Sequence, residues 1–282
     1  MRYSRILVAR VRRQGDGWKI KLRRVHKSSA DLISLLFGAA IACLALLRHA
    51  NGPAAQKRRL LLAFGITTAF ALVAWLAHGV NGSGALAGSA IAFVLAAQDL
   101  RMFWLLLLVF ALTFAATHAG RSRKRELRIA EASDGRSAAQ VMANLGIAGL
   151  ILAFAPQNWA LLGIAVLAEA AADTSSSEIG MAFPGRTVLL GSWRPVDPGV
   201  DGGVSIKGTA AAVVAASIVA SAAVALKLVS ASFALPLIGA GVLGSLVDSL
   251  IGALLEQRGL LTNDTVNLLS TAAAVGIMLL II

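Results

Sequence analysis

The chain contains nine apolar stretches that are long enough, or nearly long enough, to cross a lipid bilayer. A helix needs about 20 predominantly apolar residues to span the hydrocarbon core, so runs of this length predict membrane helices. Charged residues make up only 14% of the sequence and apolar residues 57%, which excludes a disordered chain, a coiled coil and an ordinary soluble enzyme. The stretches are residues 30–47, 60–78, 84–97, 102–119, 138–155, 159–172, 209–229, 232–255 and 265–282. The sequence therefore predicts an all-α, polytopic membrane protein with about nine membrane segments, some of them short or re-entrant.

The basic residues predict the orientation of this bundle. With nine crossings and the N-terminus inside, most of the 26 Lys and Arg residues fall on the inner side, where cytoplasmic loops collect them. The loop at 48–59 is the exception, and either the first two segments are partly re-entrant or the rule is locally broken. The net charge of +12 is thus assigned to topology and lipid headgroups and not to nucleic acid.

The distribution of charge divides the chain into a basic N-terminal segment and a membrane domain. Residues 1–29 are strongly basic and surround Gly15-Asp16-Gly17, which predicts either a small hairpin or an in-plane amphipathic helix on the cytoplasmic headgroups. Residues 30–282 are expected to form a single transmembrane catalytic domain. The single cysteine, Cys43, lies in an apolar segment, so disulfides and cysteine-based metal sites are excluded.

A polar stripe enters the fifth apolar segment. Arg136, Gln140 and Asn144 are spaced four residues apart and therefore lie on one helix face. Such a stripe in lipid needs either polar partners on other helices or a water-filled cavity. The positive charge of Arg136 favours the cavity.

Acidic residues interrupt two other segments. Glu169 and Asp173 also stack four residues apart, and Asp248 lies well inside an apolar stretch. A buried acid costs about 2.5–3.5 kcal/mol even on a lenient insertion scale, and two acids on one face repel each other. Carboxylate oxygens without nearby His or Cys suit Mg²⁺. The first pair therefore predicts a Mg²⁺ site, with an ion pair to Arg136 as the structural alternative.

A glycine-rich loop spans residues 198–209, directly before the next apolar segment. Glycines let backbone N–H groups approach an anion, and the N-terminus of the following helix is positive. Lys207 adds a point charge at this place. Together with the preceding acid cluster, the loop predicts a phosphate-binding cradle.

Five ordered motifs resemble those of a membrane protein family that includes transmembrane protein nineteen of animals and the phytyl-phosphate kinase of plants and cyanobacteria. The resemblance covers roughly residues 80–282. The sequence departs from the family pattern at Ser175, where an aromatic residue is usual, and at Val200 and Asp201 in the glycine-rich loop. The motifs are G-R-x-x-x-Q-V-x-A-N at 135–144, A-D-T-x-x-S-E-[IV]-G at 172–180, V-x-x-G-T-x-G-G-[VI]-[ST]-x-x-G at 196–208, G-S-x-x-D-S-x-x-G-A at 244–253 and N-x-x-V-N at 263–267.

The resemblance implies a membrane-embedded kinase of an isoprenoid monophosphate of the phytyl or geranylgeranyl type. A weaker similarity to CTP-dependent polyprenol kinases and CDP-diacylglycerol synthases implies CTP as the phosphoryl donor and Mg²⁺ as the cofactor. The expected setting is a prokaryotic inner membrane, with the active site facing the cytoplasm and lipids around it. A cytidylyltransferase acting on a lipid phosphate and a transporter or flippase of a phosphorylated lipid are the alternatives. The sequence leaves the oligomeric state undecided, and a homodimer is one of the possibilities.

Site residues follow from the matched motifs. Mg²⁺ is expected at Asp173, Glu178 and Asp248, and catalysis at Asp173, Arg136 and Lys207. Nucleotide or phosphate is expected to bind at Gln140, Asn144, Gly202, Gly203, Ser205, Asn263 and Asn267.

Overall fold

Each of the nine predicted segments coincides with one long helix, because a helix satisfies its backbone hydrogen bonds within a single segment. The computed structural model describes residues 6–14, 17–25, 27–50, 53–127, 129, 135–154, 160–183 and 185–282. Within these residues the long helices are α1 (Lys27–Ala50), α2 (Ala54–Leu76), α3 (Gly82–Gln98), α4 (Leu100–His118), α6 (Ala138–Phe154), α7 (Ala160–Ala182), α8 (Ile206–Ala225), α9 (Ala234–Ile251) and α10 (Asn263–Leu279). Short helical turns complete the chain: α5 (Arg121–Glu126), η2 (Ala231–Phe233) and the π-helical turn η3 (Gly252–Glu256).

Five helical stretches of the described residues are long and apolar enough to cross a membrane. They are Ser29–Leu47, Gln56–Leu76, Leu100–His118, Ile206–Ala225 and Ala231–Glu256. The first two are continuous helices, and the side of the membrane on which the basic residues between them lie stays a prediction. Helices α3 and α6 are apolar but shorter. The count of nine crossings stays a prediction.

Helix α7 corrects one expected boundary. The sixth predicted segment ends at residue 172, but α7 continues to Ala182. Asp173, Ser176 and Ser177 line a polar cavity at this end of the helix. Their polar side chains therefore face the cavity, and the helix can continue although its sequence is no longer apolar. The drop in hydropathy after residue 172 therefore marks the point where the helix meets a polar cavity, and the helix itself runs on.

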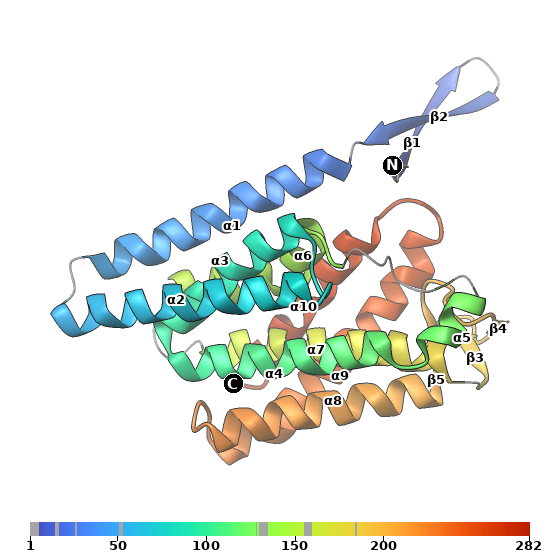
Figure 1. Ribbon diagram of the computed structural model, residues 1–282. Coiled ribbons are helices and arrows are strands. Elements are labelled where there is room, and N and C mark those ends of the chain that lie inside the picture. The colour runs from blue at the N-terminus through green and yellow to red at the C-terminus, as the bar shows by residue number, and fades with distance from the viewer. Residues whose placement is uncertain are drawn as a thin grey trace.

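Two small β-structures accompany the bundle. Strands β1 (Ile6–Gln14) and β2 (Gly17–Val25) pair as an antiparallel hairpin, one of the two forms that the sequence allowed, and residues 15 and 16 of its turn lie outside the described residues. A three-stranded sheet of order β4-β3-β5, which the sequence did not predict, forms from β3 (Thr187–Leu189), β4 (Pro195–Val196) and β5 (Gly203–Ser205). Figure 1 shows both toward the right-hand end of the helices.

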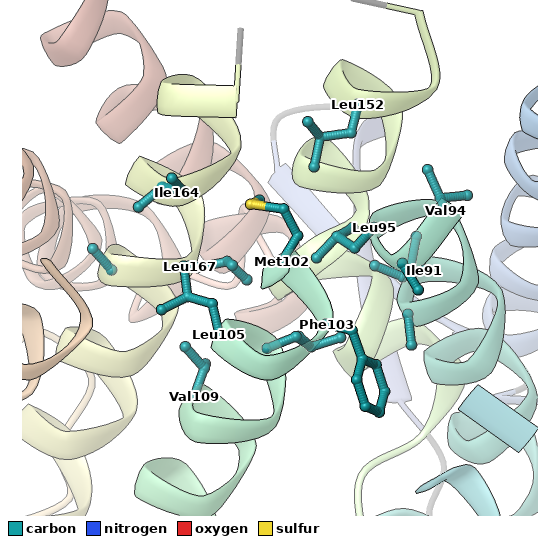
Figure 2. Packing of buried hydrophobic residues seen from close by; sticks show 14 of the residues in the cluster. Ile91, Val94, Leu95, Met102, Phe103, Leu105, Val109, Leu152, Ile164 and Leu167 are labelled. Carbon is teal, nitrogen blue, oxygen red and sulfur yellow. The ribbon is translucent and has the colours of Figure 1, made fainter. Parts of the chain in front are cut away.

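The apolar core lies where α3, α4, α6 and α7 meet. Figure 2 shows Ile91 and Leu95 of α3 close to Met102 of α4, with Leu152 of α6 and Leu167 of α7 around them. Small residues allow close helix contact, which drives helix association in lipid. A β-carbon on Gly241 of α9, for example, would lie 3.1 Å from the backbone of Ala168 in α7. This packing fixes α7 at the centre, with its polar end next to the sheet.

Candidate functional site

A polar cavity of about 340 Å³ lies among α6, α7, the end of α9 and the start of α10. The loop from Pro198 to Gly203 and Ser205 form another part of its wall. Eleven of the twelve predicted site residues line it, although they come from five separate motifs: Arg136, Gln140, Asn144, Asp173, Glu178, Gly202, Gly203, Ser205, Asp248, Asn263 and Asn267. The twelfth, Lys207, is exposed in the first turn of α8 and is not among the lining residues.

Two carboxylates reach the cavity from facing helices. Asp173 projects from α7 and accepts a hydrogen bond from the Ser245 hydroxyl of α9 at 3.4 Å. The Oδ2 atom of Asp248 in α9 is buried and has no hydrogen-bond partner among the described residues. If both acids are ionised, their negative charges repel each other unless a cation lies between them. An orphaned carboxylate oxygen beside a second carboxylate is a suitable donor set for a hard cation.

No group of three His, Cys, Asp or Glu side chains in the described part of the chain is arranged to hold a metal by itself. Mg²⁺ characteristically binds through one or two carboxylates plus substrate phosphates and water. Asp173 and Asp248 fit that mode, because the surrounding cavity leaves room for phosphate oxygens.

Glu178, the third predicted ligand, forms a buried ion pair. Its Oε2 atom accepts a hydrogen bond from the ammonium group of Lys124 in α5. Lys124 is only 1% exposed and also donates to the carbonyl oxygen of Thr117, at 2.7 Å, near the end of α4. The pair therefore fastens α4 and α5 to the polar end of α7, and Glu178 holds a cationic partner of its own.

Arg136 is fixed through its backbone. Its N–H donates to the Gly79 carbonyl at 3.2 Å, and its own carbonyl accepts from Asn81 N–H at 3.0 Å. These bonds join the loop before α3 to the loop before α6. The guanidinium group donates to the Thr174 hydroxyl of α7 at 3.3 Å. The arginine is thus held between two helix starts at the edge of the cavity.

The first amides of α6 are satisfied by three different elements. Ser137 N–H donates to the side chain of Gln140 at 2.9 Å, and Ala138 N–H to the Ser83 hydroxyl at 3.2 Å. Ala139 N–H donates to Asp31 of α1 at 3.2 Å. Because these bonds satisfy orphan donors of the helix, they fix the direction in which α6 carries its polar stripe. Asp31 had not been singled out from the sequence.

A close approach at Gly84 provides a test of this arrangement. A β-carbon at Gly84 would lie 2.0 Å from the carbonyl oxygen of Arg136, whereas one at Gly82, in the same helix turn, meets nothing within 4 Å. We expect Gly84→Ala to lower the free energy of unfolding by about 1–3 kcal/mol, as overpacking typically does. Gly82→Ala should be neutral or stabilising, because alanine favours a helix over glycine by about 1 kcal/mol. Thermal unfolding in detergent, followed by tryptophan fluorescence, measures both. Equal stability of the two variants would contradict the contact.

The glycine-rich loop packs tightly against the turn that follows Asp248. Gly202 has φ of +77°, and a β-carbon there would lie 2.4 Å from the amide nitrogen of Ala253 in η3. Gly203 N–H already donates to the Val200 carbonyl at 2.9 Å. Ser205 caps α8 by accepting a hydrogen bond from Gly208 N–H at 3.1 Å. These contacts give the loop a structural role, and the phosphate cradle stays a prediction.

The cavity includes residues that the sequence reasoning missed. Glu256 lines it at the end of η3, and Ser249 of α9 and Thr187 of β3 line it as well. Glu256 lies eight residues after Asp248, which is close to two helical turns. The predicted apolar segment ended at residue 255, so this spacing was not used. Thr187 comes from the small sheet, whose short strands carry no clear sequence signal.

Comparison with known proteins places the chain in a family. Residues 65–275 match the family described as "Integral membrane protein DUF92". An uncharacterised membrane protein of Methanocaldococcus jannaschii is 32% identical over 219 residues, which cover 76% of this chain and 90% of the relative. An uncharacterised membrane protein of Synechocystis is 30% identical over 195 residues, covering 64% and 76%.

A plant relative is also similar. Protein VTE6, chloroplastic, of Arabidopsis thaliana is 27% identical over 225 residues, which cover 74% of this chain and 62% of the relative. No solved structure matches the chain. The family suggested by the five motifs is confirmed, and the chain belongs to the DUF92 family of integral membrane proteins.

Proposed function

We propose that this protein is a membrane-embedded kinase that transfers the γ-phosphoryl group of CTP to an isoprenoid monophosphate. The single observation that carries the proposal is the polar cavity. It gathers two facing carboxylates, an arginine and amide side chains from four separate motifs, and the glycine-rich loop of the fifth forms another part of its wall; the described lining includes no His or Cys. The resemblance of the five motifs to the family that includes the phytyl-phosphate kinase supports an enzymatic role of this kind, and the chloroplastic protein VTE6 is one of the similar proteins. We further propose that the cavity faces the cytoplasm.

The chemistry needs positioning and charge neutralisation more than acid–base catalysis. The second pKa of a phosphate monoester is about 6, so the acceptor phosphate is largely ionised near neutral pH and requires no strong general base. An oxygen of that phosphate forms a bond to the γ-phosphorus, the bond to the β-phosphate oxygen breaks, and CDP and the isoprenoid diphosphate leave.

The residues of the cavity divide this work. Asp173 and Asp248 would hold Mg²⁺, which when bound neutralises charge on the nucleotide phosphates. Arg136, whose guanidinium fork suits phosphate oxygens, would bind the acceptor or the transferred group. The amides of Gln140, Asn144, Asn263 and Asn267 would orient nucleotide and acceptor from two sides of the cavity. Lys207 is assigned no contact with substrate, because it is exposed outside the lining.

The test is an assay of the purified full-length protein in detergent with CTP, Mg²⁺ and geranylgeranyl monophosphate. Formation of CDP and geranylgeranyl diphosphate in equal amounts supports the kinase. Release of pyrophosphate would instead identify a cytidylyltransferase. If the protein consumes no nucleotide with either geranylgeranyl or phytyl monophosphate, the proposal fails and transport of a phosphorylated lipid becomes the better hypothesis.

A further inference from the structure

A second, mainly apolar cavity lies beside the polar one. It is bounded by α2, α3, α4 and α6, with Ala170 of α7 contributing to its lining. Three residues, Arg136, Gln140 and Asn144, line both cavities. The polar stripe of α6 therefore stands at the junction between a space suited to phosphate and a space suited to hydrocarbon.

The two long walls of the apolar cavity differ in side-chain size. Helix α3 presents small residues, Ala85, Gly88 and Ser89. Opposite, Phe70 of α2 packs edge to face against Phe110 of α4, with ring centroids 5.2 Å apart. Glycine and alanine on one side leave room that the aromatic rings on the other side do not fill. The remaining volume is about 110 Å³, which suits one hydrocarbon chain better than two.

The cavity also has direction. Along α4 its lining runs from Leu106 to His118, a rise of roughly 18 Å at 1.5 Å per residue. Arg121 and Arg136 line the end near His118, and apolar residues such as Phe70, Leu106 and Val109 line the other end. An occupant would thus have an anionic end among these basic groups and an apolar end deep in the bundle.

We propose that this cavity binds the single hydrocarbon chain of a lipid phosphate, with the phosphate at Arg136 and the chain between α3 and the aromatic wall. The inference rests on the proposed function for the assignment of the phosphate, and adds the residues that select the chain. Gly88 sets the width of the passage, and Phe70 and Leu106 set the greatest chain length.

The test fills the passage without disturbing the backbone. A β-carbon at Gly88 meets only Val141 Cγ1, at 4.0 Å, so Gly88→Leu directs its added bulk into the cavity. The matched control is Gly65→Leu in α2, where nothing lies within 4 Å of the new β-carbon and the residue is exposed. Binding of geranylgeranyl monophosphate, dimethylallyl monophosphate and CTP is measured by native mass spectrometry of the full-length protein.

We expect Gly88→Leu to weaken the binding of geranylgeranyl monophosphate at least tenfold, with less than a twofold change for dimethylallyl monophosphate and CTP. Gly65→Leu should change none of the three. Unchanged long-chain binding in a folded Gly88→Leu variant overturns the inference, as does an equal loss in Gly65→Leu. If Gly88→Leu does not fold, Ser89→Leu fills the same cavity and takes its place. Equally strong, Gly88-dependent retention of phosphatidic acid would overturn the assignment to a single chain.

The kinase proposal and the chain-site proposal can fail independently of each other. If no acceptor is phosphorylated but long-chain binding depends on Gly88, the kinase proposal fails while the chain site stands. If turnover is observed and filling the cavity leaves the affinity for geranylgeranyl monophosphate unchanged, the chain site fails while the kinase stands.

Discussion

Asp173→Asn is expected to lower the rate of phosphoryl transfer by about 100-fold or more. Changes to groups that only support a metal ligand already cost about 10–100-fold, so the loss of a direct ligand should exceed that range. Asp248→Asn should have a similar effect, because its unpartnered Oδ2 atom offers the second carboxylate on the facing helix. The measurement is the rate of CDP formation as a function of Mg²⁺ concentration, since a ligand change also raises the Mg²⁺ concentration needed for half-maximal rate.

Stability provides an independent readout for the same variants. When both Asp173 and Asp248 are ionised and no cation is bound, their charges repel each other, so removing one of them should raise the unfolding temperature of the metal-free protein at a pH high enough to ionise both. Asp197→Asn is the matched control, since Asp197 is exposed in the loop before the glycine-rich stretch and does not line the cavity. A variant of Asp173 that keeps its activity and its Mg²⁺ requirement would exclude the proposed metal site.

Helix periodicity is the reason that the sequence could locate most of the cavity. Residues four apart share a helix face, so the spacing of Arg136, Gln140 and Asn144 predicted a single polar stripe, and all three line the cavity. Two of the three acids within apolar stretches were equally informative, because such residues are expensive in lipid unless they face a cavity, and Asp173 and Asp248 line it. Glu169, the third, is buried in α7 and is not among the lining residues. The family motifs then linked stripes on different helices that no local pattern could relate.

Contacts between distant parts of the chain could not be read in this way. Lys124 and Glu178 are 54 residues apart, and a single sequence does not reveal that they pair. Lys207 lies outside the lining of the cavity for a local reason: a β-carbon on its neighbour Gly208 would lie 2.6 Å from the carbonyl oxygen of Ser176 in α7. With Gly208 facing α7, Lys207 points away from the cavity and is exposed.

The largest loss of stability is expected for Lys124→Met. It leaves the Glu178 carboxylate buried without its cation, and breaking a buried ion pair by removing one partner costs about 3–5 kcal/mol. The carbonyl of Thr117 also loses the ammonium donor, so the end of α4 should loosen from α7. Thermal unfolding in detergent should show a marked fall in the midpoint temperature. The control is Arg125→Met, which removes an exposed basic side chain of the same short helix.

The double variant Lys124→Met/Glu178→Gln tests whether the stability loss comes from breaking the ion pair or from each side chain independently. With both charges removed, no uncompensated ion stays buried, and we expect much of the lost stability to return. Losses that simply add would show that the two residues act independently. Glu178→Gln alone then decides between its two roles. As a partner of Lys124 it should change stability and leave the Mg²⁺ concentration for half-maximal rate unaltered, whereas as a metal ligand it should raise that concentration, as Asp173→Asn does.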